Sequence, residues 1–179
     1  SRGLGDVYKR QVLTHLQQSL EIIRELGERS IEAILLNNIS GVYDAWGRYD
    51  EALPFLEQSL TIDREIGDRS GEATTLNNLS LIYQSRGRYE EALTLLQQSL
   101  TIQRDLGDRS SEATILNNIS SIYQGWGRNE EALTLLQQSL YIRLEIGDRK
   151  GEANSLNNIS QIYQGWGRYD EALTLLQQC

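Results

Sequence analysis

Two adjacent asparagines recur along the chain at an interval of 40 residues, and their side chains are the best suited to binding a ligand. A side-chain amide carries both hydrogen-bond donors and acceptors, so a row of amides can pair with the backbone of an extended peptide whatever its sequence. A glutamine that recurs at the same interval has the same capacity. The candidate binding residues are Asn37, Asn77, Asn117 and Asn157 in the first row, Asn38, Asn78, Asn118 and Asn158 in the second row, and Gln84, Gln124 and Gln164.

Catalytic and metal chemistry has little support in the sequence. The chain holds 1 Cys and 1 His, too few for a disulfide framework, a structural zinc site or a two-histidine metal site. His15 has no partner residue suggested nearby, and the acidic residues recur at the same interval, whereas a catalytic pair would be a singular feature. We therefore expect no enzymatic activity, no bound metal and no cofactor.

The charge balance limits the expected partners. With 25 acidic against 17 basic residues, the 179-residue chain has a formal charge of -8, which repels phosphate backbones and anionic lipid headgroups. Apolar runs are far shorter than the roughly 20 residues that span a bilayer, so we expect a cytoplasmic protein that binds neither nucleic acid nor membranes. Since the chain lacks an initiator Met and stops within its pattern at Cys179, we expect it to be a piece of a longer protein.

A repeat of 40 residues organises the chain. Residues 51–90 align with the next two blocks without a gap, and the register runs back to residue 11 and forward to the end. Residues 1–10 depart from it, and we expect a non-native or disordered leader there. The expected divisions are a partial repeat at 11–28, full units at 29–68, 69–108 and 109–148, and a truncated unit at 149–179.

Each unit is predicted to hold two amphipathic helices. Apolar residues recur at three- and four-residue steps through residues 73–83 and again through residues 92–102. Gly87 separates these two segments, and Gly107 with Asp108 separates the unit from the next one. Because Gly suits the left-handed residue that ends a helix and Asp suits an N-cap, the predicted unit is helix, tight turn, helix, short loop.

The repeated positions resemble the tetratricopeptide repeat (TPR). The resemblance is carried by Leu76, Leu79, Ser80, Tyr83, Gly87, Tyr89, Ala92, Leu96, Ser99 and Leu100. It covers nearly all of residues 11–179, although the unit is longer than the usual one of about 34 residues and has a Gly-Asp-Arg loop where a Pro is usual. Longer units of this kind are similar to those of bacterial signalling proteins, Pins-type polarity adaptors and kinesin light chains.

The resemblance implies an all-α TPR α-solenoid, a right-handed superhelix of antiparallel helix pairs whose first helices line a concave groove. With Leu79 buried, helix geometry places Asn77 and Gln84 opposite the buried arc, so ligand binding is the preferred role of the first asparagine row. The second row matches a TPR position at which Asn commonly fixes helix packing. Packing is therefore preferred for Asn78 and its equivalents, and the other role stays open for both rows.

Other conspicuous residues are expected to serve the fold. We expect the tyrosine column of Tyr83 and the tryptophan column of Trp126 to pack, and the arginine–glutamate column of Arg69 and Glu72 to form a solvated ion-pair face. The only proline, Pro54, predicts a bend or a delayed helix start. Because the first helices lack Lys and Arg between their end residues, a clamp for acidic C-termini is not expected.

We therefore expect a non-enzymatic protein–protein interaction module that binds a peptide or partner helix in the groove. One alternative is a regulatory or sensor segment of a larger bacterial signalling protein with a protease, kinase or nucleotide-switch domain. A second alternative is a structural scaffold that self-associates through the open ends of the repeat array.

Overall fold

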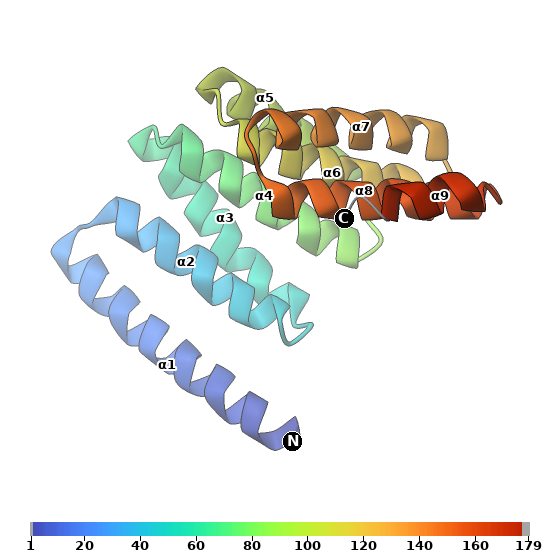
Figure 1. The fold of residues 1–179 in the computed structure, drawn as a ribbon. Coiled ribbons are helices and arrows are strands. Elements are labelled where there is room, and N and C mark those ends of the chain that lie inside the picture. The colour runs from blue at the N-terminus through green and yellow to red at the C-terminus, as the bar shows by residue number, and fades with distance from the viewer. Residues whose placement is uncertain (1, 177–179) are drawn as a thin grey trace. The chain divides into compact units, whose positions relative to one another are not determined.

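The computed structural model describes residues 2–176, and the side chains of residues 8–174. Within these residues the chain forms α-helices joined by short turns, with no strand (Figure 1). None of these helices combines the length and apolar character that crossing a membrane requires. Cys179 and the last residues of the truncated unit lie outside the described part.

The chain divides into two compact units, Ser1–Ser99 and Leu100–Cys179, and the boundary between them in the sequence falls within α5. In the first unit, α1 to α4 each pack antiparallel to the next helix in this series, and in the second unit α6 to α9 do the same (Figure 1). The first unit contains α1 (Arg2–Leu26), α2 (Arg29–Asp44), α3 (Tyr49–Ile66), α4 (Arg69–Ser85) and the start of α5 (Tyr89–Leu106). The second contains the rest of α5, α6 (Arg109–Gly125), α7 (Asn129–Glu145), α8 (Arg149–Gly165) and α9 (Tyr169–Leu176).

A glycine with positive φ closes each turn between helices. Gly67 has φ 71° and Gly87 has φ 73°, a conformation that a Cβ would strain. Asp68, Asp108 and Asp148 then cap the next helix by accepting the backbone N–H of the residue three positions on. The predicted glycine ends and aspartate N-caps are confirmed.

Aliphatic residues at helical spacing form the core of each unit, and the prediction that Leu76 and Leu79 are buried is confirmed. The first unit has one cluster of Leu20, Ala33, Leu36, Ile39 and Ile62 and another of Ala52, Leu56, Leu79 and Ile82. The second unit has one cluster of Ala132, Leu136, Ile159 and Ile162 and another of Ala113, Leu116 and Ile142. Each cluster joins residues from successive helices, as expected for stacked helix pairs.

Two boundary predictions need correction in part. Residues 2–10 of the segment expected as a non-native or disordered leader are helical and continue into the partial repeat, and a non-native origin of this segment stays a prediction. Of the two outcomes predicted from Pro54, the delayed start is wrong, because α3 begins at Tyr49, in register with the start of α5, and the bend stays a prediction. Proline lacks the N–H that would reach the carbonyl of Asp50, so the helix continues past one missing hydrogen bond.

The arginine–glutamate columns form ion pairs as predicted, but only their arginines are exposed to solvent, while the glutamates are largely buried. Glu72 is only 8% exposed and accepts hydrogen bonds from both Arg69 and Arg64. Arg64 lies near the end of α3, in a column that the prediction did not include. Because the same pattern surrounds Glu32 and Glu112, each buried carboxylate ties the end of one helix to the start of the next.

The aromatic columns pack as predicted, with one addition. Trp126 makes an edge contact with Tyr123 at a centroid distance of 5.7 Å, and the Arg128 guanidinium lies 4.5 Å from the centre of the tyrosine ring. Arg88 stacks on Tyr83 in the same way at 4.3 Å. In the turns within the repeats, the arginine that follows the glycine therefore covers the tyrosine through a cation–π contact.

Candidate functional site

The first helices of two successive repeats, α2 and α4, contact each other and enclose two adjoining cavities. The larger has a volume of about 350 Å³ and the smaller about 110 Å³, and Asn37 and Asn78 line both. We call this surface the α2–α4 groove. Its larger cavity is lined by Ala33, Ile34, Asn37, Asn38, Asp63, Asp68, Ser70, Gly71, Thr74 and Asn78, and its smaller cavity by Asn37, Ser40, Gly41, Asp44, Leu56, Asn78, Leu81 and Ile82.

Asn37 is held by contacts within the protein. Its Nδ2 donates to Ser59 Oγ at 2.6 Å and to Thr75 Oγ1 at 2.8 Å, which uses both amide hydrogens. Its Oδ1 accepts a hydrogen bond from Asn78 Nδ2 at 2.9 Å. Asn37 therefore has the packing role that the sequence analysis preferred for the neighbouring row.

Asn78 is oriented by this network and keeps hydrogen-bonding capacity. Its bond to Asn37 is its single hydrogen bond to the described residues, so its Oδ1 and second N–H have no partner among them. The residue is half-buried and lines both cavities. The groove thus presents a fixed amide with one donor and one acceptor.

The other candidate residues lie on both units. Asn38 is exposed beside the larger cavity, whereas Asn77 and Gln84 are half-buried and do not line either cavity. In the second unit, the half-buried residues are Asn117, Asn118, Gln124 and Asn158, and the exposed ones are Asn157 and Gln164. The structure therefore brings together three of the predicted residues in one groove: Asn37, Asn38 and Asn78.

The floor of the larger cavity is acidic, a feature that the sequence analysis missed. Asp63 is 2% exposed, and its Oδ2 accepts a hydrogen bond from Thr75 Oγ1 at 2.9 Å. Burial, together with the negative charges of Asp68 and Glu72, raises the pKa of Asp63. Among the ion pairs of the described residues, none includes Asp63. A buried carboxylate without a counter-ion therefore faces this cavity.

A glycine lets two carboxylates approach the backbone of α4. A Cβ placed on Gly71 would lie 2.7 Å from Asp63 Oδ1 and 2.8 Å from Asp68 Oδ2, so it would clash with both. Asp68 accepts the Gly71 N–H through its Oδ1 at 2.8 Å, which leaves its Oδ2 beside Asp63 Oδ1. Two carboxylates therefore converge where any other residue would place a side chain.

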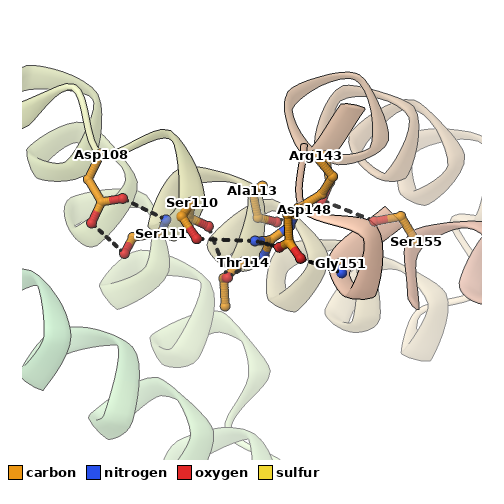
Figure 2. A network of polar contacts seen from close by, with 10 residues as sticks. Asp108, Ser110, Ser111, Ala113, Thr114, Arg143, Asp148, Gly151 and Ser155 are labelled. Carbon is orange, nitrogen blue, oxygen red and sulfur yellow. Dashed lines mark hydrogen bonds and ion pairs between the residues drawn. The ribbon is translucent and has the colours of Figure 1, made fainter. Parts of the chain in front are cut away.

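The second unit fills the equivalent position with an arginine (Figure 2). Arg143 stands in the column of Asp63 and is 7% exposed. It donates to Asp148 Oδ2 at 2.6 Å, Ser110 Oγ at 3.2 Å and Thr114 Oγ1 at 2.5 Å. Gly151 makes room for it, because a Cβ there would lie 2.5 Å from Arg143 Cδ.

This arginine changes the electrostatics of its neighbour. The pKa of Asp148 is lowered, first by the hydrogen bond from the Gly151 N–H and also by the Arg143 charge. The prediction from Lys and Arg on the first helices did not include Arg143, because this residue comes from the second helix of its repeat and reaches α6. Its guanidinium is already paired with Asp148.

Comparison with known proteins assigns these helix pairs to a family. The sequence profile of the tetratricopeptide repeat matches residues 2–65, 71–145 and 111–179, which together cover nearly the whole chain. The chain belongs to the tetratricopeptide repeat family. No curated protein sequence matches it significantly.

Solved structures share the TPR fold at low sequence identity. BtubC (BKLC) from P. vanneervenii is 21% identical with a TM-score of 0.84, and the match covers 98% of this chain and 73% of that one. A Rap protein complexed with competence and sporulation factor is 18% identical with a TM-score of 0.82, covering 99% and 50%. A STAND protein with a tetratricopeptide repeat sensor from Pyrococcus horikoshii is 17% identical with a TM-score of 0.78, covering 91% and 26%.

These matches confirm the predicted TPR α-solenoid. TPR arrays are generally protein-interaction modules, typically without catalytic activity. Among the described residues, no group of three or more His, Cys, Asp or Glu side chains is placed to hold a metal ion. The chemistry of this TPR groove therefore consists of the Asn78 amide, the acidic floor and the exposed side chains at its rim.

Proposed function

We propose that the chain is a protein-binding module that captures an extended peptide of a partner protein in the α2–α4 groove. The observation that carries this proposal is the orientation of the Asn78 amide by Asn37. An extended peptide presents alternating N–H and C=O groups, and the free oxygen and second N–H of Asn78 match one of each. Orientation in advance reduces the side-chain entropy lost on binding.

The surroundings of this amide suit a peptide. Ile34 and Leu81 are exposed at the larger and smaller cavity respectively, where they can contact apolar peptide side chains. Since α2 and α4 belong to the proposed repeats 29–68 and 69–108, binding requires both repeats. The net charge of -8 favours a protein over a nucleic acid as the partner, and a cytoplasmic location is part of the proposal.

The Rap and STAND structures support binding and sensing in arrays of this fold. The Rap protein was solved with competence and sporulation factor bound, and the STAND protein has a TPR sensor within a chain of which the match covers 26%. A sensor segment of a larger bacterial signalling protein is therefore the second candidate function. It would use the same groove and pass the binding event to an adjoining domain.

The test uses peptides selected against the chain from a random display library, with affinities measured by fluorescence anisotropy. We expect Asn78→Ala to weaken binding roughly tenfold, because the peptide backbone loses both partners. Gln17→Ala is the matched control, since it removes an exposed amide from α1, outside the groove. Circular dichroism verifies that both variants keep their helicity, and equal affinity of Asn78→Ala and the unmodified chain contradicts the proposal.

A further inference from the structure

We propose that the larger cavity of the α2–α4 groove binds the guanidinium group of an arginine side chain, with Asp63 as its counter-ion. The inference rests on the proposed function for the source of that arginine, a peptide captured in the groove. It adds the chemical class of the ligand, a basic peptide.

The charge of Asp63 is not balanced within the protein. Taking a carboxylate out of water costs free energy unless a cation or several hydrogen bonds compensate it, and Asp63 has no cationic partner among the described residues. The fold itself does not require an acid here, because the same column holds Ile23, Gln103 and Arg143 in the other repeats. A buried carboxylate that lines a cavity and serves no internal ion pair is poised for an external cation.

Arg143 gives support that is independent of the charge balance. In the second unit, the chain places its own guanidinium beside Asp148, the equivalent of Asp68. Gly151, the equivalent of Gly71, provides the room for it. The first unit keeps the capping aspartate and the glycine but has the short Asp63 in place of Arg143, and the cavity of about 350 Å³ is found there. Arg143 therefore demonstrates which chemical group this architecture accommodates (Figure 2).

The geometry of the floor suits a planar cation. Asp63 Oδ1 and Asp68 Oδ2 converge beside Gly71, and both residues line the cavity. The five N–H donors of a guanidinium form a rigid fork that can bridge two carboxylates, whereas an ammonium is a compact, strongly hydrated charge. Thr75 Oγ1 donates a hydrogen bond to the other oxygen of Asp63, Oδ2, and so fixes the orientation of the carboxylate. The cavity floor therefore fits the guanidinium of an arginine better than the ammonium of a lysine.

The first experiment uses a minimal probe, N-acetyl-arginine amide, with its neutral isostere N-acetyl-citrulline amide as the control ligand. Titrations at pH 8 and low ionic strength are followed by NMR, through the backbone amide of Gly71 and the side-chain amide of Asn78. The arginine probe should shift both signals in a saturable manner, and the citrulline probe should not. Equal shifts from the two probes would overturn the proposal.

Matched variants test whether the Asp63 carboxylate supplies the charge that binds the arginine probe. Asp63→Asn keeps the shape of the side chain but removes its charge, and we expect it to weaken the arginine probe by roughly tenfold or more. Asp105→Asn removes one exposed negative charge from the second unit and should leave the affinity unchanged. If Asp63→Asn binds the arginine probe as well as the unmodified chain does, the cavity is not a guanidinium site.

A second variant tests the site by filling it. The arginine of Asp63→Arg should occupy the cavity, as Arg143 occupies the equivalent place in the second unit, and should pair with Asp68. We expect it to abolish binding of the arginine probe while raising the melting temperature. Unchanged probe binding by a folded Asp63→Arg protein overturns the proposal.

Selected peptides separate this inference from the proposed function. Peptides that bind in the groove, show no enrichment of arginine and bind Asp63→Asn normally would overturn the arginine site and leave the proposed function standing. Saturable binding of the arginine probe without any peptide binding would sustain the arginine site and overturn the proposed function. Peptides enriched in arginine whose affinity falls in Asp63→Asn would support both.

Discussion

The residues beneath helices α2 and α4 and those beneath helices α6 and α8 are arranged alike. They differ in charge at one repeat position, which holds Asp63 in the first unit and Arg143 in the second. Both have a capping aspartate, Asp68 or Asp148, and a glycine three residues later. In one, Asp63 is buried without a cation; in the other, Arg143 pairs with the capping aspartate. The residue at this column of the second helix therefore differs between a short carboxylate beside a cavity and a guanidinium that pairs with the capping aspartate.

Removing Arg143 should have the largest effect on this comparison. Arg143→Ala leaves Asp148 without its cation and empties the space that the arginine fills, so we expect a loss of about 3 kcal/mol in the free energy of unfolding. Urea denaturation measures it. Arg104→Ala is the control, because half-exposed Arg104 shares Glu112 with Arg109, and we expect a loss of about 1 kcal/mol or less. Equal losses from the two substitutions would contradict the assignment of a special role to Arg143.

Adding a methyl group to the glycines should have the next largest effect. In Gly151→Ala the new Cβ meets the stem of Arg143, which is fixed by its hydrogen bonds, so we expect a loss of about 2 kcal/mol. In Gly71→Ala it meets only the two carboxylates beside an open cavity, and we expect a smaller loss together with weaker binding of the arginine probe. Thermal unfolding of the two variants measures both losses. A loss in Gly71→Ala as large as that in Gly151→Ala would contradict the prediction, because the cavity beside Gly71 would then be as tightly filled as the site of Arg143.

The pH dependence of stability should report the charge of Asp63. Because its pKa is raised in the folded state, folding takes up a proton between the ordinary pKa of 3.8 and the raised value. Stability from this residue is therefore greatest at low pH and falls as the pH rises through that window. The charged groups around it are Asp68 and Glu72, and Glu72 is paired with Arg64 and Arg69.

Asp63→Asn removes this dependence. We expect the variant to be about 1 kcal/mol more stable than the unmodified chain at pH 7, because the unpaired buried charge is gone. Its advantage should vanish below the ordinary carboxyl range. Urea denaturation from pH 3 to pH 8 measures the difference, and a variant that is less stable at pH 7 would show that the Asp63 charge is already compensated within the protein.

The ends of the array should show the smallest protection energies. A terminal helix lacks one of its two neighbours, so amide exchange should be slowest near residues 76–140 and fastest before residue 11 and after residue 169. Exposed Leu173 on α9 is consistent with a missing neighbour at that end. Uniform protection along the chain would indicate that the ends are covered, most simply by self-association.

The repeat and its turns were predictable from the sequence because they depend on local rules. Glycine spacing, aspartate caps and helical periodicity act within a few residues, and the structure confirms them. The helical character of residues 2–10 escaped prediction because a segment that departs from the repeat pattern can still be helical. Such a segment needs only helical propensity and a neighbour to continue a helix, whatever its register.

The acidic floor escaped prediction because it is a property of two helices. Position 63 is one of several polar positions on its own helix, and its burial depends on what faces it from α4. A signal was nevertheless present in the pairing of two columns of the repeat. The pairs are Ile23 with Ile31, Asp63 with Gly71, Gln103 with Ser111, and Arg143 with Gly151. Small residues accompany the charged ones, and this covariation within the sequence itself indicates that the two columns are in contact.

The Gly-Asp-Arg sequence shared by the turns at residues 67, 107 and 147 also makes the array modular at the level of its gene. Deleting residues 69–108 would join Asp68 to Arg109 and regenerate the same Gly-Asp-Arg junction, with its left-handed glycine and its capping aspartate. The deletion would remove Gly71 but keep Asp63, which would then face Ser111 instead. Loss of this block by unequal recombination would thus change the side chain that faces the Asp63 floor, so the pairing of the two columns can change without a single point mutation.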